Sequence, residues 1–240
     1  MLTIDIMDKR LREIKELNNP VYRTKKSYLR KKGESGYLTY RVFRPFLKLK
    51  YKLFRKVNSP SPWLSPVSIV FLKKHLTKDM TGIEFGSGFS TLFFSPKVKK
   101  LFSIEHHEGW YLKIKKELKK KQIKNVDYRL FPKNDSQKFK GEKFDLEEKF
   151  KFNIRRDYVK YFQSISDLPD ESVDFVLVDG RARTECAYYS ISKLKKGGLF
   201  ILDNSERDRY NLVFEFLSEW EMQNTTNGLT DTTFWVKPNK

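Results

Sequence analysis

The 240-residue sequence predicts an α/β fold in which helices cover both faces of a mostly parallel sheet, a doubly wound arrangement. Three observations support this prediction. Short apolar runs alternate with helical patterns from residue 66 onward, glycines follow some of these runs, and the chain closes with a hairpin pattern over 221–236. We therefore expect parallel strands joined by helices, with an antiparallel hairpin added at the end.

Each expected strand is a run of about four to six residues rich in apolar side chains. The run at 173–178 is typical of a strand that is buried on both faces. Asn227-Gly228 has the residue types that a tight hairpin turn requires. The expected parallel strands are 81–85, 100–105, 126–131, 173–178 and 199–202.

The expected helices lie between these runs. Pro66 is placed at a helix start, where its missing N–H costs nothing. Gly197-Gly198 is expected to separate a helix from the strand at 199–202. The polar stretch 133–157 is longer than an ordinary connection and is predicted to be a lid or a substrate loop. The expected helices are 66–76, 90–94, 110–121, 158–166, 184–194 and 210–220.

Composition excludes several classes of protein. Hydrophobic residues make up 39% of the chain, which excludes wholesale disorder. The single cysteine, Cys186, excludes an internal disulfide framework and is expected to be a small packed side chain. No apolar run approaches the roughly 18 residues of a membrane span, and the N-terminal residues mix acids with bases unlike a signal peptide. We expect a cytoplasmic protein, with peripheral membrane association as an open alternative.

The positive charge is concentrated at the N-terminal end. The chain has a formal charge of +19, and residues 1–56 hold 17 Lys and Arg against 5 acids. A proline-rich segment then follows at 59–66. This asymmetry predicts a basic helical extension over 1–60, attached to a main domain over 61–240.

Within the extension we expect a helix over 3–17, a loop over 21–36 and a second helix from about 45 to 57. The second helix is basic and amphipathic. Its apolar stripe is formed by Val42, Phe46, Leu49, Leu53 and Val57. Three interpretations remain open for the segment 37–57: packing on the main domain, association with an anionic membrane, and binding of RNA, the last being the least favoured.

A glycine-containing turn from Glu84 to Thr91 lies between a predicted strand and a predicted helix. Its glycines allow a tight turn and the close approach of a ligand, and the helix start offers free N–H groups. Thr91 stands where the dinucleotide fingerprint has its third glycine, so that fingerprint is broken. The turn therefore predicts either a ligand loop or an ordinary tight turn.

Glu105 ends the next strand, 19 residues after Gly86. An acid at this spacing can accept hydrogen bonds from both ribose hydroxyls of an adenosine ligand. A surface glutamate in a helix-entry turn is the alternative interpretation. His106 and His107 follow without the spacing of a zinc site, and His106 is expected to lie against an adenine.

Acidic and amide side chains also end two later strands. Asp179 follows 173–178, and Asp203-Asn204 follows 199–202. The carboxyl ends of these strands face the ligand crevice of an open α/β sheet. Their oxygen atoms suit Mg²⁺, Ca²⁺ or Mn²⁺, although polar residues at strand ends also serve as simple caps. Arg181 and Arg183 could pair with an anionic group or neutralise Asp179.

Together these residues resemble the class I S-adenosylmethionine-dependent methyltransferases over about 61–240. Five elements occur in the family's order: the acid-x-Gly-x-Gly loop at 84–88, Glu105, the fourth-strand motif at 173–179, the Lys-Lys-Gly-Gly turn at 195–198 and the terminal hairpin. The resemblance implies a Rossmann-like sheet of seven strands with S-adenosylmethionine as the cofactor. The residues it assigns to the cofactor are Glu84, Gly86, Ser87, Gly88, Ser90, Thr91, Glu105 and His106.

Asp179 and Asp203-Asn204 further resemble the catechol-type, cation-dependent O-methyltransferases, although Gly180 to Arg183 departs from their pattern. This resemblance implies a Mg²⁺ or another divalent cation on Asp179, Asp203 and Asn204, and Asp179 as the catalytic residue. It predicts O-methylation of a small molecule, a sugar or a glycan. An RNA methyltransferase and a catalytically silent platform that binds a polyanion or a membrane are the alternatives.

Overall fold

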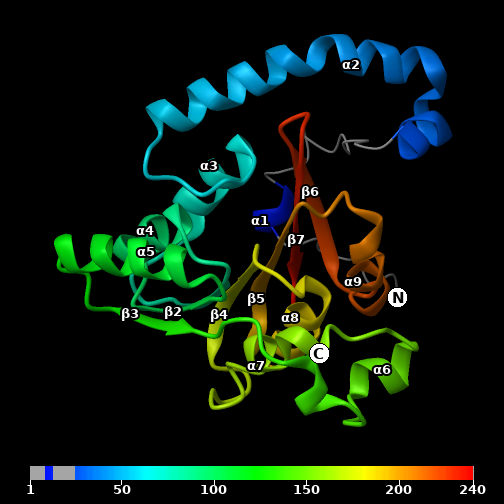
Figure 1. The fold of residues 1–240 in the computed structure, drawn as a ribbon. Helices are drawn as coiled ribbons and strands as arrows, with labels where there is room; N and C mark the ends of the chain where they lie inside the picture. The colour runs from blue at the N-terminus through cyan, green and yellow to red at the C-terminus, as the bar shows by residue number, and fades with distance from the viewer. Residues whose placement is uncertain (1–8, 13–24, 240) are drawn as a thin grey trace, which may run out of the picture.

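A computed structural model describes residues 9–12 and 25–239, and its centre is a seven-stranded sheet of order β3-β2-β1-β4-β5-β7-β6 (Figure 1). The first five strands run parallel, and the last two form an antiparallel hairpin that pairs with β5 through β7. The predicted Rossmann-like α/β fold is confirmed. The strands are β1 Thr81–Phe85, β2 Lys100–Glu105, β3 Val126–Leu130, β4 Val173–Val178, β5 Leu194–Asp203, β6 Glu221–Thr226 and β7 Asp231–Val236.

Helices cover both faces of the sheet (Figure 1). Val176 and Val178 of β4 pack in one core with α7, α8 and α9, whereas Phe175 and Leu177 pack in a second core with α3 and α4. This alternation follows from the two-residue period of a strand. The helices are α1 Lys9–Arg12, α2 Lys25–Val57, α3 Pro66–His75, α4 Phe89–Phe94, α5 Glu108–Lys120, α6 Asp145–Phe150, α7 Val159–Phe162, α8 Arg183–Ser190 and α9 Asn211–Phe216. Short 3-10 turns are η2 Ser95–Lys97, η3 Ser136–Phe139, η4 Arg156–Tyr158 and η5 Asp208–Tyr210.

The turn at Gly197-Gly198 differs from its prediction. We expected the two glycines to separate a helix from a strand, but both lie inside β5, which begins at Leu194. Gly197 has a φ of 70°, and the pairing of β5 with β4 shifts register at the start of the strand. The glycines therefore bend a continuous strand, as at a bulge, and α8 ends earlier than predicted.

Helix α2 is much longer than predicted. The prediction of a loop over 21–36 is wrong for residues 25–32 and 34–36, which are helical, while 21–24 lie outside the described residues. The helix does not begin near Pro45 but contains it. Gly33, with φ 71° and ψ −178°, forms a kink between two helical parts, a conformation that glycine adopts without a Cβ clash. Pro45 removes one backbone hydrogen bond without ending the helix. The helix predicted over 3–17 is described only at α1, and its remainder lies outside the described residues.

The C-terminal part of α2 contacts the main domain. Leu47 lies over Gly228 in the β6–β7 turn, and the Tyr51 hydroxyl donates to the backbone oxygen of Leu64 at 2.9 Å. Phe54 packs against the core under α3. Because these three residues share one side of the helix, the opposite side is left uncovered by the described chain.

The polar stretch 133–157 has structure of its own. It contains η3 and α6, and it buries Phe144, Leu146 and Ile154 in the larger core. Arg156 joins Glu147 through two hydrogen bonds of 2.5 and 2.8 Å. The segment is thus packed on the domain, and its role as a lid stays a prediction.

No helix in the described ranges is both long and apolar enough to cross a bilayer.

Candidate functional site

A pocket of about 660 Å³ lies over the carboxyl ends of the parallel strands. The loops that follow β1, β2, β4 and β5 form its floor, and Tyr51, Arg55 and Trp63 form part of its wall. It lies where ligands bind in open α/β sheets. The predicted residues that line it are Gly86, Ser87, Glu105, His106, Asp179, Asp203 and Asn204.

Position 86 requires a glycine for two reasons. Its φ is 93°, and a Cβ there would lie 2.6 Å from the backbone nitrogen of Gly180. A Cβ on Gly180 would in turn meet the hydroxyl of Tyr161. The loops after β1 and β4 therefore cross at van der Waals contact, which fixes the floor of the pocket.

Thr91 stands at the position of the third glycine of the dinucleotide pattern, and its side chain has a structural role there. Its hydroxyl accepts from the backbone N–H of Gly88 at 3.0 Å and donates to Glu84 at 2.7 Å. Glu84 is fully buried and also accepts from Ser103 at 2.8 Å. Burial raises the pKa of Glu84 to about 7, although these hydrogen bonds oppose the rise. Glu84 and Thr91 thus lie beneath the loop and support it, outside the lining of the pocket.

Glu105 is buried at the tip of β2 and accepts four hydrogen bonds. One oxygen accepts from the backbone and the hydroxyl of Ser87, and the other from the backbone N–H groups of His106 and His107, at 2.8 to 3.0 Å. Burial opposes ionisation, but the hydrogen bonds from His106, His107 and Ser87 outweigh it and hold the pKa of Glu105 below its usual range. The carboxylate is therefore charged at neutral pH.

These four bonds fill the acceptor positions of the Glu105 carboxylate. The hydroxyl of Ser87 also lies 2.6 Å from the hydroxyl of Tyr128, which offers it a second partner. A turn of the Ser87 hydroxyl toward Tyr128 would free one position on Glu105 for a ligand hydroxyl.

Trp110 and His106 line the pocket together with Glu105. The Trp110 indole N–H donates to the backbone oxygen of Ser87 at 2.6 Å, and a second pocket of about 260 Å³ extends past Gly88 and Ser90. His106 Nδ1 lies 3.0 Å from Glu105, and its ring packs edge-on against Tyr161. These rings give the side of the pocket next to Glu105 flat surfaces.

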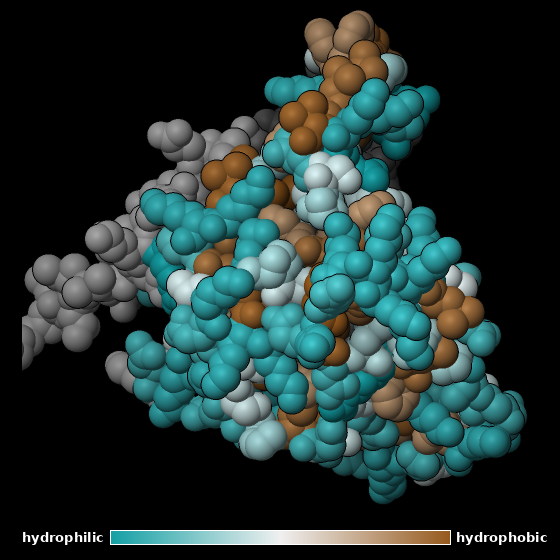
Figure 2. Space-filling model, turned by 90° about the vertical axis from the view of Figure 1, so that its left-hand side faces the viewer, coloured by the Kyte–Doolittle hydropathy of each residue, from teal (hydrophilic) through white to brown (hydrophobic). Residues whose placement is uncertain are grey.

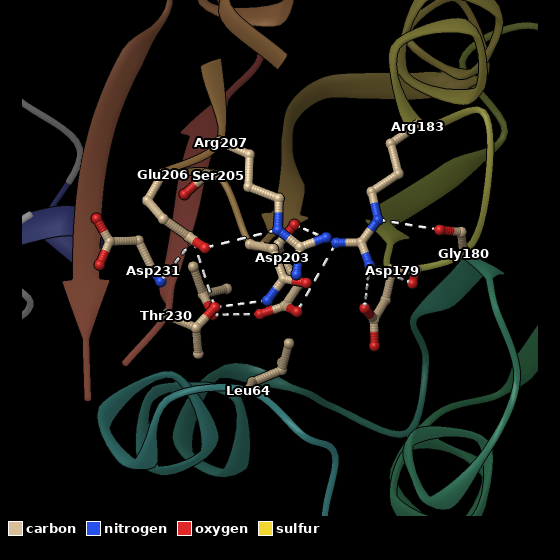
Figure 3. A network of polar contacts seen from close by, with 12 residues as sticks. Leu64, Asp179, Gly180, Arg183, Asp203, Ser205, Glu206, Arg207, Thr230 and Asp231 are labelled. Carbon is tan, nitrogen blue, oxygen red and sulfur yellow. Dashed lines mark hydrogen bonds and ion pairs between the residues drawn. The ribbon is translucent and has the colours of Figure 1, made fainter. Parts of the chain in front are cut away.

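Arg183 lies between the two aspartates that end β4 and β5 (Figure 3). Its guanidinium donates to Asp179 at 2.8 Å and lies 3.8 Å from the carboxylate of Asp203, whose backbone oxygen it also contacts. Asp203 accepts from Thr232 at 2.9 Å. Burial and the nearby Asp179 charge raise the pKa of Asp203 well above its ordinary value, while Arg183 opposes the rise.

This arrangement does not fit the predicted divalent cation. A cation shared by Asp179 and Asp203 would take the position in which the Arg183 guanidinium already balances both carboxylates. The amide of Asn204 donates to Thr230 at 2.5 Å. The described residues contain no cluster of three His, Cys, Asp or Glu side chains suited to a metal ion.

Sequence reasoning missed several residues of the pocket. Tyr51 and Arg55 are one turn apart on α2, and the Arg55 guanidinium stacks on Trp63 at 4.2 Å from the ring centroid. No local pattern links α2 to the sheet, because the contact depends on how the long helix docks. The position of Trp110 was a weak indication that it lies near the site, since Trp110 begins the helical pattern after Glu105. Cys186 is buried and packed, as predicted.

Solved structures of low sequence identity resemble this chain. A methyltransferase-like protein from Silicibacter pomeroyi is 21% identical, with a TM-score of 0.52 over 75% of this chain and 90% of that one. A SAM-dependent methyltransferase from Aquifex aeolicus is 16% identical, with a TM-score of 0.46 over 78% and 97% of the two chains. Precorrin 8w decarboxylase from Methanobacterium thermoautotrophicum is 15% identical, with a TM-score of 0.49 over 75% and 94%. No protein-family model matches the sequence, and no curated protein does.

Proposed function

We propose that this chain, which has the Rossmann-like fold of the class I S-adenosylmethionine-dependent methyltransferases, transfers a methyl group from S-adenosylmethionine to an oxygen atom of a small molecule, a sugar or a glycan. One observation carries the proposal. Glu105 places a buried and ionised carboxylate beside the loop of Gly86 and Gly88, in a pocket over the strand ends. That combination suits a ligand with a ribose and an extended polar tail.

The residues around the glycine loop would hold the cofactor. Glu105 would accept a hydrogen bond from a ribose hydroxyl at the position that the Ser87 hydroxyl vacates, and the loop of Gly86 to Gly88 would lie along the amino-acid part. Gly88 lacks the Cβ that would lie 3.3 Å from the indole nitrogen of Trp110, so the space above the loop stays open. His106 would flank the adenine, as the sequence predicts.

Bound S-adenosylmethionine would supply an electrophilic methyl group on its sulfonium sulfur, which the acceptor oxygen would take with S-adenosylhomocysteine as the leaving group. Asp179 lines both larger pockets, so its carboxylate can accept a hydrogen bond from the acceptor hydroxyl and receive its proton. Arg183 fixes the orientation of Asp179. Tyr51, Arg55 and Trp63 form a wall of the pocket and would exclude water from it. Most of the rate enhancement would come from holding the acceptor oxygen close to the methyl carbon. The proposal involves no divalent cation, because Arg183 occupies the space between the acids.

Calorimetric titration with S-adenosylmethionine and with S-adenosylhomocysteine tests this function. We expect both to bind at one site per chain with micromolar or tighter dissociation constants. A protein that is folded by circular dichroism but binds neither compound would overturn the proposal.

We also propose that the outer side of α2 associates with an anionic membrane surface. The segment 37–57 contains seven Lys and Arg and no acid. Figure 2 shows hydrophobic atoms gathered on the projecting part of the molecule that α2 forms. An exposed apolar stripe beside basic side chains suits an interface between lipid headgroups and acyl chains. The stripe consists of Leu38, Val42, Phe46, Leu49, Leu53 and Val57, which are 55% to 83% exposed.

Co-sedimentation with vesicles tests this association. We expect the full chain to bind phosphatidylglycerol vesicles and not phosphatidylcholine vesicles, and the double variant Phe46→Ser, Leu53→Ser to bind roughly tenfold more weakly or worse. Leu112→Ser is the matched control, because Leu112 is equally exposed on the lysine-rich helix α5. Point variants are preferable to deletion of the extension, which would remove Tyr51 and Arg55 from the pocket. Equal binding by the double variant and the control would contradict the association.

A further inference from the structure

A third pocket, of about 200 Å³, adjoins the main pocket and is lined by five arginines. The two pockets share Gly180, Arg181, Arg183 and Arg207. The arginines come from three segments of the chain: the polar stretch 133–157 before α7 (the insert), the loop after β4 and the loop after β5. They are Arg155, Arg181, Arg183, Arg207 and Arg209.

The positive charge of this pocket is only partly balanced. Arg183 is paired with Asp179 and Asp203, Arg155 donates to Asp157 at 3.0 Å, and Arg207 lies 3.7 Å from Glu206. Arg181 and Arg209 contact no carboxylate in the part of the chain that the structure describes. Two guanidinium groups therefore remain without a counter-charge at the pocket.

Glu185 is the one acid in the lining, and its carboxylate is directed at the backbone of the insert. It is 1% exposed and accepts from the backbone N–H of Arg155 at 2.8 Å. Burial raises its pKa, with the Arg155 contact opposing the rise. It serves to hold the insert against the start of α8.

The N-terminus of helix α8 adds positive electrostatic potential to the arginine pocket. Helix α8 begins at Arg183, and Ala182 before it has no side chain that could cap the first N–H groups. Thr184 and Glu185, in the first turn, line the pocket. The positive end of the helix thus points toward the same space as the arginines.

We propose that this arginine pocket binds a phosphate monoester group of the methyl acceptor. The inference rests on the proposed methyltransferase function and deepens it, because it assigns the acceptor to the class of phosphorylated small molecules. Three terminal oxygens and a double negative charge can engage several guanidinium groups from different directions, whereas a carboxylate is satisfied by one bidentate arginine. The acceptor would extend from the shared edge at Gly180 and Arg181 to Asp179 in the main pocket.

This assignment also gives the insert a role. Phe152 and Arg155 are its two residues in the lining of the arginine pocket, to which the β5 loop contributes Arg209 and Tyr210. The insert would therefore contribute to acceptor choice through this pocket and not through contact with the cofactor.

Phosphorus NMR with two small probes tests the proposal. Methyl phosphate represents a terminal monoester, and dimethyl phosphate represents the diester of a nucleic-acid backbone. At constant ionic strength we expect methyl phosphate to bind the full chain at least tenfold more tightly than dimethyl phosphate. The double variant Arg181→Gln, Arg209→Gln should weaken the binding of methyl phosphate at least tenfold.

Arg41→Gln is the matched control, because Arg41 is an exposed arginine of α2 outside all three pockets. It should change the dissociation constant less than twofold. Equal losses in the control and the double variant, or equal affinity for the two probes, would overturn the assignment. Titration with S-adenosylhomocysteine in the same samples separates the two proposals: cofactor binding without methyl phosphate binding overturns the arginine pocket alone, and the reverse result overturns the methyltransferase function.

Discussion

Replacing Glu105 by alanine is expected to weaken the binding of S-adenosylmethionine about 10- to 100-fold. A hydrogen bond to a charged group contributes about 1.5 to 3 kcal/mol, so the loss of the one ribose bond for which the carboxylate has a free position accounts for this factor. Glu105 is the buried carboxylate at the tip of β2, and its low pKa keeps it charged at neutral pH. Calorimetric titration of the variant with S-adenosylmethionine provides the measurement.

The variant also removes the acceptor of three backbone N–H groups, those of Ser87, His106 and His107. Thermal unfolding must therefore be recorded with each titration. Glu105→Gln keeps the shape of the side chain and should show an intermediate loss. Glu108→Ala makes the same change at an exposed position in the first turn of α5 and should bind normally. Normal binding by a folded Glu105→Ala protein would exclude Glu105 from the cofactor site.

The sheet could be predicted from the sequence because its strands are short apolar runs with distinct turns between them. Once the order of the strands is known, the residues at their carboxyl ends must meet, which is why Gly86, Glu105, Asp179 and Asp203 line one pocket. The error at Gly197 has a different origin. Glycine ends a strand or bends it depending on its neighbours in the sheet, and the sequence alone does not contain the register of β5 against β4.

The wall of the pocket could not be predicted in this way. Tyr51 and Arg55 follow the same helical pattern as residues that face outward, and only the docking of α2 places them beside the site. The arginine pocket likewise combines Arg155, Arg181 and Arg209 from three segments. Contacts between distant segments depend on the packing of whole elements, and local spacing does not encode them.

Replacing Arg183 by methionine is expected to lower the free energy of unfolding by about 3 to 5 kcal/mol at neutral pH. The Arg183 side chain is 8% exposed, and its guanidinium lies between the carboxylates of Asp179 and Asp203, whose side chains are 24% and 4% exposed. Methionine fills a similar volume but leaves two acids close together without a cation. Urea unfolding followed by circular dichroism measures the change.

The loss should depend on pH in a defined direction. An aspartate in the unfolded chain releases its proton near pH 4, whereas burial and Asp179 keep the pKa of Asp203 well above that value in the folded chain. Asp203 therefore makes the unfolding free energy fall as the pH rises between these two pKa values. Without Arg183 the folded pKa values rise further, so the deficit of Arg183→Met should be smallest near pH 4 and should grow toward neutral pH.

Lys195→Met is the matched control for this series. Lys195 pairs with Asp174 at 2.7 Å, but the two side chains are 45% and 23% exposed, so water screens the pair and its loss should cost less than about 1 kcal/mol at any pH. If Arg183→Met is no less stable than Lys195→Met, or if its deficit does not change with pH, Arg183 does not compensate the two acids. A large deficit that grows with pH, in contrast, would mean that the cation required by Asp179 and Asp203 is a side chain of the protein itself.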